Sequence, residues 1–289
     1  MKPRATSGLI CLFLAPLFYG GMSVSAKLAG SYLSIWQIGV GRFILGLAGI
    51  PLLVWFLGLS LWGQKRLLLT VRGVCGAMAF LLLVASFQHI PLSLAMILFY
   101  LYPAFTALLS PWVAGEPTAR AAWPFICGSF AGIVVILWPG EASPAFNIGH
   151  VSAAAAAVLC ALTLLLVRRL GRDNNIYTLF FYLCLTGTLA GLGPLLLSDL
   201  PILPRAGAAW LAVLAVAVFS VGAQLSINQA LASIPASRVS VMMTAEVPLV
   251  ACFGVLFLGE PVTLQLVFGA LFIFGCGCAL NLLPLRPGG

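Results

Sequence analysis

Long apolar stretches alternate with short polar tethers along almost the whole chain. Each stretch is close to the roughly 20 residues that an α-helix needs to cross a lipid core about 30 Å thick. Glycine, proline and charged residues gather in the tethers, where they favour turns. The pattern therefore predicts ten transmembrane helices, over residues 8–28, 33–57, 67–88, 91–113, 119–138, 148–168, 176–197, 207–230, 235–258 and 262–284.

The composition excludes a soluble domain of this size. Hydrophobic residues make up 62% and charged residues 7% of the 289 positions, and the mean hydropathy is +1.15. A soluble domain carries about 25% charged residues, so lipid must surround most of these side chains. We therefore expect an all-α polytopic protein of the lipid bilayer, because a helix satisfies its own backbone polar groups in lipid.

The net charge of +8 does not indicate a nucleic-acid partner, because the basic residues are scattered among the tethers. If the N-terminus is cytoplasmic, eleven basic residues fall on the inside, only Lys27 and Arg205 fall on the outside, and Arg42 is left within a helix. This excess predicts both termini in the cytoplasm of a bacterial inner membrane. The inside set is Lys2, Arg4, Lys65, Arg66, Arg72, Arg120, Arg168, Arg169, Arg172, Arg238 and Arg286.

Residues for soluble-type catalysis do not cluster in the sequence. The eight cysteines form no Cys-x-x-Cys pair, and both histidines, His89 and His150, lie at the ends of apolar runs. Neither a metal site nor a phosphate-binding glycine loop is indicated. We therefore expect no enzyme activity, no cofactor and no metal.

The chain also repeats itself at nearly one offset. Val-Ala-Gly-Glu-Pro-Thr at 113–118 returns as Leu-Gly-Glu-Pro-Val-Thr at 258–263, and Glu116 and Glu260 are 144 residues apart. Two further pairs follow the same order: His-Ile-Pro-Leu-Ser at 89–93 with Ser-Ile-Pro-Ala-Ser at 233–237, and Leu-Ala-Gly at 47–49 with 189–191. We predict two repeats, residues 1–140 and 141–289. Because each has five helices, an odd number, the second repeat is inverted relative to the first.

Residues 2–26 also have the outline of a cleavable signal peptide. We interpret them instead as the first helix, since their removal would leave the first repeat one helix short.

These motifs resemble those of the EamA-type branch of the drug/metabolite transporter superfamily. The resemblance rests on the two Ile-Pro helix starts, on Pro103 and Pro248 within helices four and nine, on the two Gly-Glu-Pro closures, and on Arg42-Phe43. It implies ten helices, a central cavity and alternating access. Similar proteins export amino acids and related metabolites, or import vitamins and nucleoside-like compounds.

We favour export of an amino acid or related metabolite, with import of a vitamin or nucleoside-like compound as the alternative. A channel is disfavoured because the chain has no ring of charge or filter motif. An intramembrane enzyme is disfavoured because only one acid is buried and the histidines lie at the edges.

Two charged residues are predicted near the bilayer centre. Arg42 lies nine residues into helix two and Glu246 eleven residues into helix nine, so at about 1.5 Å per residue both are ~14–16 Å deep. A lone charge there costs on the order of 2.5–3.5 kcal/mol, so each needs a partner or a wet cavity. Tyr100, Tyr102 and Gln224 are further candidates for the cavity, since their helices place them away from the interface where tyrosine is usual.

The roles of the two charged residues stay open in the sequence. Arg42 is either the anchor of a substrate carboxylate, which a guanidinium holds with two parallel hydrogen bonds, or a structural counter-ion. Glu246 is a static partner of Arg42, a proton-coupling site, or a group that binds a substrate ammonium.

Other residues are interpreted as structural. Glu116 and Glu260 end long helices and are expected to accept hydrogen bonds from amides at the start of the next helix. Pro103 and Pro248 interrupt helical hydrogen bonding. Gly128, Gly132 and the glycines of helix ten let helices approach closely, within the monomer rather than across a dimer. A monomer and a homodimer both remain compatible with the sequence.

Overall fold

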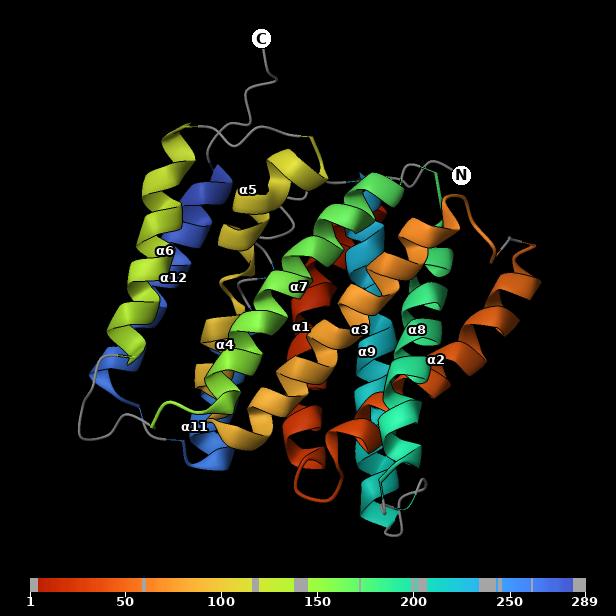
Figure 1. The fold of residues 1–289 in the computed structure, drawn as a ribbon, viewed down its shortest axis with the longest axis horizontal. Coiled ribbons are helices and arrows are strands. Elements are labelled where there is room, and N and C mark those ends of the chain that lie inside the picture. The colour runs from red at the N-terminus through yellow and green to blue at the C-terminus, as the bar shows by residue number, and fades with distance from the viewer. Residues whose placement is uncertain are drawn as a thin grey trace.

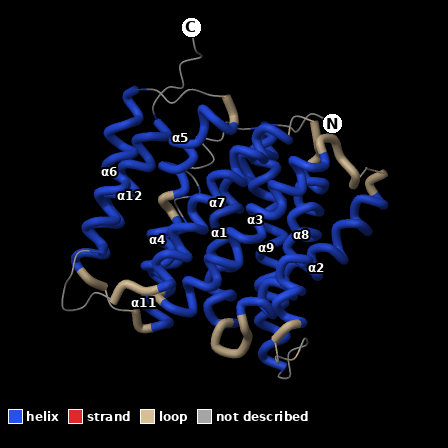
Figure 2. Tube along the Cα trace, in the orientation of Figure 1, coloured by secondary structure: helices blue, strands red, loops and turns tan. Residues whose placement is uncertain are grey.

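The computed structural model describes residues 5–58, 61–115, 120–137, 145–171, 173–198, 201, 207–233, 243, 246–260 and 262–282, and every regular element in this part of the chain is helical (Figures 1 and 2). The elements are α1 (Ala5–Ala29), α2 (Ile35–Phe56), α3 (Arg66–His89), α4 (Leu92–Phe99), α5 (Tyr102–Val113), the 3-10 turn η1 (Arg120–Ala122), α6 (Trp123–Leu137), α7 (Ile148–Leu170), α8 (Ile176–Leu196), α9 (Gly207–Ser233), α11 (Glu246–Leu258) and α12 (Leu264–Leu282).

At least one helix overlaps each of the ten predicted ranges. Among the described residues, seven spans are long and apolar enough to cross a membrane, and α4 with α5 makes one of them. The remaining helices, α6 and α11, are shorter, and in α12 the described apolar run covers only Val267–Cys276. The protein is therefore an all-helical, multi-pass membrane protein.

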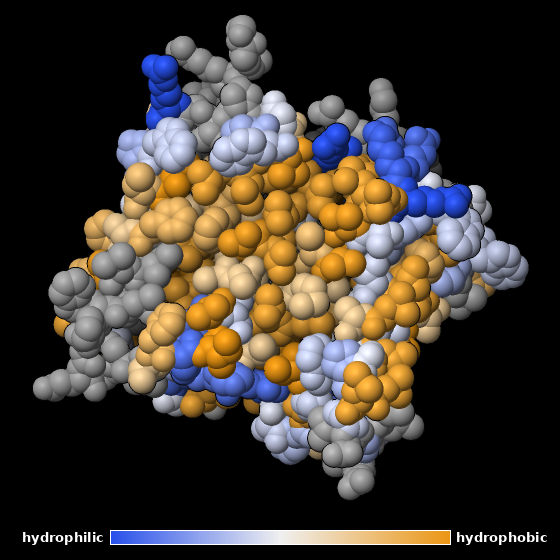
Figure 3. Space-filling view, viewed as in Figure 1, coloured by the Kyte–Doolittle hydropathy of each residue, from blue (hydrophilic) through white to orange (hydrophobic). Residues whose placement is uncertain are grey.

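The surface has the apolar belt that lipid requires. Large hydrophobic side chains such as Phe13, Leu211 and Phe272 are exposed on the outside of the bundle. In Figure 3 an apolar band crosses the middle of the molecule between two more polar edges. An exposed apolar surface of this extent is stable only in contact with lipid or a partner.

Helices far apart in the sequence pack in pairs: α1 with α9, α3 with α7, α2 with α8, and α6 with α12. Glycines allow this close packing. A Cβ added at Gly21 would lie 2.8 Å from the Phe219 ring, and one added at Gly222 would lie 2.8 Å from the Phe18 ring. The absence of side chains at these two positions therefore brings α1 and α9 together, in the way expected where lipid gives no hydrophobic drive.

The predicted GxxxG pair of α6 packs in the same way. A Cβ at Gly128 would lie 2.5 Å from Cys276 Sγ, and one at Gly132 would lie 2.8 Å from the Ile273 side chain and 3.0 Å from the Gly269 carbonyl oxygen. Both contacts are with α12 of the same chain.

The fourth span is broken in its middle. α4 ends at Phe99 and α5 begins at Tyr102, and the intervening Tyr100 and Leu101 are buried. Pro103 has no amide hydrogen to donate to the Phe99 carbonyl, which would be its partner in a continuous helix. This break gives the two tyrosines their position at the centre of the bundle.

Candidate functional site

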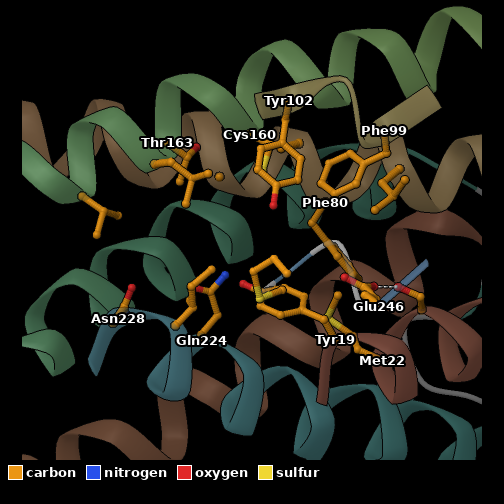
Figure 4. Close-up of a pocket in the computed structure, with 18 of the residues that line it drawn as sticks. Tyr19, Met22, Phe80, Phe99, Tyr102, Cys160, Thr163, Gln224, Asn228 and Glu246 are labelled. Atoms are coloured by element: carbon orange, nitrogen blue, oxygen red, sulfur yellow. Dashed lines mark hydrogen bonds between the residues drawn. The ribbon is translucent and has the colours of Figure 1, made fainter. Parts of the chain in front are cut away.

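A cavity of about 90 Å³ lies at the centre of the bundle, between α1, α3, α7 and α9 (Figure 4). All five binding or coupling candidates from the sequence line it: Arg42, Tyr100, Tyr102, Gln224 and Glu246. The cavity is smaller than the ~300–1,000 Å³ of typical ligand pockets. The helices around it must therefore separate further to admit a metabolite.

Glu246 begins α11 and is 2% exposed. Ser23 Oγ of α1 donates to Glu246 Oε1 at 3.0 Å, and the Tyr100 hydroxyl lies 2.6 Å from Glu246 Oε2. The same hydroxyl lies 2.5 Å from the carbonyl oxygen of Met243. A hydroxyl has one hydrogen, so it cannot donate to both oxygens at once. A protonated Glu246 resolves this, because the carboxyl group then donates to Tyr100 and Tyr100 donates to Met243.

Arg42 is 4% exposed and does not form an ion pair with Glu246. Its Nε donates to Ser220 Oγ of α9 at 2.5 Å, and its guanidinium lies 3.7 Å from the centre of the Phe80 ring. The aromatic face partly replaces the missing counter-ion. The interpretation of Glu246 as a static partner of Arg42 is therefore wrong in this structure, because each residue takes its partners from other helices.

One atom of the Arg42 guanidinium, Nη1, is buried and has no hydrogen-bond partner. A buried unpaired donor on a charged group is costly. Arg42 lines the cavity, so a bound molecule could reach this donor once the surrounding side chains move apart.

Arg72 is a further residue of this cavity, and the sequence had predicted a different position for it. It was assigned to a cytoplasmic tether, but it lies in the second turn of α3, is 1% exposed and lines the cavity. Its Nη1 donates to the Leu179 carbonyl oxygen of α8 at 2.8 Å, while its Nε is buried without a partner. Its place as the sixth residue of the apolar run predicted at 67–88 was the available signal.

Further polar side chains face the cavity from two sides. Gln224 and Asn228 come from α9 and Cys160 and Thr163 from α7 (Figure 4). Gln224 and Asn228 are four residues apart, so they share one face of their helix. Asn228 Oδ1 is another buried atom without a partner. Asn228 and Thr163 were not among the binding candidates predicted from the sequence.

Glu260 accepts hydrogen bonds from the start of α4. The Leu92 amide donates to Oε1 at 2.5 Å, the Ser93 amide donates to Oε2 at 3.0 Å, and the Ser93 hydroxyl also donates to Oε2. The predicted role is correct in kind, but the helix was wrongly identified as the one that follows in the chain. Glu116 lies outside the described residues.

Lys27 lies beside this contact. Its Nζ donates to the carbonyl oxygens of Phe87 and, at 3.2 Å, of Ile90, at the C-terminal end of α3. A cation is favoured at this end of a helix dipole, as a carboxylate is at the start of α4. Lys27 and Glu260 thus bind the two sides of the α3–α4 junction and hold this end of the bundle together.

An apolar bundle around a charged, polar cavity defines a membrane transporter. The chain belongs to the EamA-like transporter family, whose model matches residues 6–138 and 147–283. This family membership confirms the resemblance that the repeated motifs suggested.

Two similar proteins are an exporter and a solute carrier. The pseudopaline exporter CntI of Pseudomonas aeruginosa strain UCBPP-PA14 is 29% identical over 271 residues, which are 93% of this chain and 94% of the exporter. Human solute carrier family 35 member G1 is 26% identical over 222 residues, which are 72% of this chain and 60% of the carrier.

A protein of known crystal structure has the same fold. It covers 98% of this chain and 99% of its own length, with a TM-score of 0.71 and 21% sequence identity. Such a likeness supports the helical arrangement described above.

Proposed function

We propose that this protein is a secondary transporter of the bacterial inner membrane that exports an amino acid or a related metabolite by alternating access. The observation that carries the proposal is the central cavity, in which a guanidinium with a free N–H and a carboxyl group lie on different helices. The guanidinium can hold the carboxylate of an amino acid with two parallel hydrogen bonds, and the Glu246 carboxyl can exchange a proton during transport. The similarity to a named exporter favours export over import.

We also propose ten transmembrane helices in two inverted five-helix repeats, residues 1–140 and 141–289. The pairing of helices supports this division. When each span is exchanged for the one five places along, the α1–α9 contact becomes the α7–α3 contact, and the α2–α8 and α6–α12 pairs map onto themselves. An inverted repeat with its site between the halves would produce this symmetry of contacts.

In transporters with inverted repeats, alternating access is expected to come from one half-bundle rocking against the other, but the same pairing favours a different movement here. Every main helix pair joins the two repeats, so one repeat cannot rock as a unit against the other. The groups that move are instead mixed: α3, α4, α5 and α7 form one group, and α1, α9 and α11 form the other. The cavity lies between these two groups.

The inferred orientation places both termini in the cytoplasm. α1 begins and α12 ends at the same end of the molecule (Figure 1). With Arg72 removed from the count, the sequence has ten basic residues in the segments predicted to be cytoplasmic and two in those predicted to be outside, which still agrees with the positive-inside rule.

Export by intact cells tests the proposal. Cells that produce pseudopaline but lack its exporter would express this chain, and pseudopaline and the amino acids would be quantified in cells and medium. We expect one of these metabolites to accumulate in the medium and to fall inside the cells. The Arg42→Leu variant, compared at equal abundance in the membrane, should lose this effect. Unchanged metabolite levels with abundant wild-type protein would contradict the proposed function.

A further inference from the structure

The cavity contains more positive than negative charge. Among the described residues that line it, Arg42 and Arg72 carry positive side chains and Glu246 alone carries an acidic one. The two guanidinium groups interact electrostatically with each other. With Glu246 ionised the cavity has a net charge of +1, and with Glu246 protonated the net charge is +2.

The two arginines share an unusual feature. Both are at least nine-tenths buried, and each has one nitrogen without a hydrogen-bond partner: Nη1 of Arg42 and Nε of Arg72. A buried cation without a counter-ion is unfavourable in a low-dielectric interior, and so is an unpaired donor. Each site would be completed by an oxygen atom that carries negative charge.

We infer that the cargo is an amino acid derivative with two acidic groups, one held by Arg42 and the other by Arg72. This inference rests on the proposed function and names its substrate class. A cargo with two carboxylates and one ammonium has a net charge of −1, which neutralises the cavity when Glu246 is ionised. A neutral amino acid with one carboxylate leaves one guanidinium unpaired and the cavity charged.

Arg72 also has a structural role, which the test must separate from cargo binding. Its Nη1 bond to the Leu179 carbonyl joins α3 to α8. Loss of that bond would destabilise the protein and affect the binding of every cargo equally. Loss of an anion site would weaken the binding only of a cargo with the second acidic group.

Pairs of probes that differ in one acidic group separate these roles. The purified full chain in detergent is titrated with three acidic probes, L-glutamate, L-aspartate and L-2-aminoadipate. It is also titrated with L-glutamine and L-asparagine, the amides of the first two. The thermal stabilisation of the protein at each probe concentration gives the dissociation constants. We expect at least one acidic probe to bind about 10–100-fold more tightly than its amide, because one charged hydrogen bond is lost in the amide.

The variants assign the two anchors. Arg72→Gln should weaken the preferred acidic probe to the level of its amide and leave the affinity for the amide unchanged. Arg42→Gln should weaken both probes of the pair. Arg66→Gln is the matched control on the same helix, since Arg66 is exposed and lies outside the cavity. If Arg72→Gln does not fold, the Arg72→Lys variant is compared with the wild type instead. We expect the lysine variant to have a reduced preference for the acidic probe over its amide.

Two outcomes overturn the inference: equal binding of acidic and amide probes to the wild type, or no binding by any of the three acidic probes. Export of a monocarboxylate amino acid in the cell assay, together with either outcome, would leave the proposed transport function intact. Failure of export and of all binding would count against both.

Discussion

At the scale of single residues, the most informative group is the carboxyl of Glu246. One carboxyl oxygen contacts the Ser23 hydroxyl, and the other contacts the Tyr100 hydroxyl. The Tyr100 hydroxyl also contacts the Met243 carbonyl oxygen. The count of hydrogens fits a protonated carboxyl group. We therefore propose Glu246 as the proton-coupling group, which would carry a proton in this state and lose it in another.

A Glu246→Gln variant tests this role. The glutamine amide reproduces the protonated carboxyl, because its nitrogen donates to Tyr100 and its oxygen accepts from Ser23. We expect normal abundance, loss of transport driven by a proton gradient by about tenfold or more, and preserved exchange of cargo between the two sides of a proteoliposome. Wild-type, pH-dependent uptake by this variant would exclude Glu246 as the coupling group. Ser23→Ala serves as a control that loses one hydrogen bond and keeps the ionisable group.

Single residues also show how well membrane depth can be predicted from the distance of a residue to its helix ends. Arg42, Glu246 and the two tyrosines were placed near the middle of the membrane from their distances to helix ends, and all of them line the cavity. Arg72 was missed because the same reasoning assigns a basic residue near a helix end to the interface. The hydrogen-bond partner of each side chain depends on the rotation of the helices about their axes. For this reason Ser220, the partner of Arg42, could not be identified from sequence spacing alone.

At the scale of elements, the apolar pattern predicted the helix ends to within a few residues, except in the range 235–258, where only the second half, α11, is described as a helix. It did not place the end of α4 at Phe99, because an interrupted helix has the same hydropathy as a continuous one. Pro103 marks the break, but Pro51 and Pro194 lie inside α2 and α8 without ending them. A proline therefore interrupts a membrane helix only where the surrounding packing satisfies the freed carbonyl.

The hydrogen bonds of Glu260 predict a measurable contribution to stability. In a Glu260→Ala variant the Leu92 and Ser93 amides at the start of α4 lose their acceptor, as in the loss of a helix cap, which costs about 0.5–2 kcal/mol. We expect a lower melting temperature in detergent. Asp173→Asn breaks the exposed ion pair with Lys65, which is worth about 0–1 kcal/mol, and should have the smaller effect. A Glu260→Ala variant as stable as the wild type would show that this cap does not stabilise α4.

The contact between α6 and α12 predicts a second effect at this scale. A larger residue at Gly132 must displace the Ile273 side chain and approach the Gly269 carbonyl, and such overpacking costs roughly 1–3 kcal/mol. Gly132→Leu should therefore lower the melting temperature and the yield of folded protein. Gly275→Leu is the matched control, because a Cβ at Gly275 meets nothing within 4 Å. Equal stability of the two variants would argue against tight packing at Gly132.

At the scale of the whole molecule, the two mixed helix groups meet at the end opposite the termini. There Lys27 of α1 binds the end of α3, and Glu260 after α11 binds the start of α4. These bonds join one group to the other, and the alternating access proposed above requires them to break when the cavity opens on this side. The structure therefore represents a state closed at this end, which the inferred orientation makes the outer one.

A disulfide across the same junction should lock the transporter in this state. A Cβ added at Gly30, which follows α1, would lie 3.4 Å from Cγ of Gln88 in α3. A cysteine at position 88 can place its sulfur where this Cγ lies, next to the Cβ of a cysteine at position 30, which brings the pair within reach of a disulfide. We expect the Gly30→Cys/Gln88→Cys variant to transport normally when reduced, to lose about 90% or more of its transport when oxidised in proportion to the crosslinked fraction, and to recover with dithiothreitol. Peptide mass spectrometry would identify the crosslink among the eight native cysteines. The two single variants should be insensitive to oxidation, and full transport by a fully crosslinked protein would show that this end need not open.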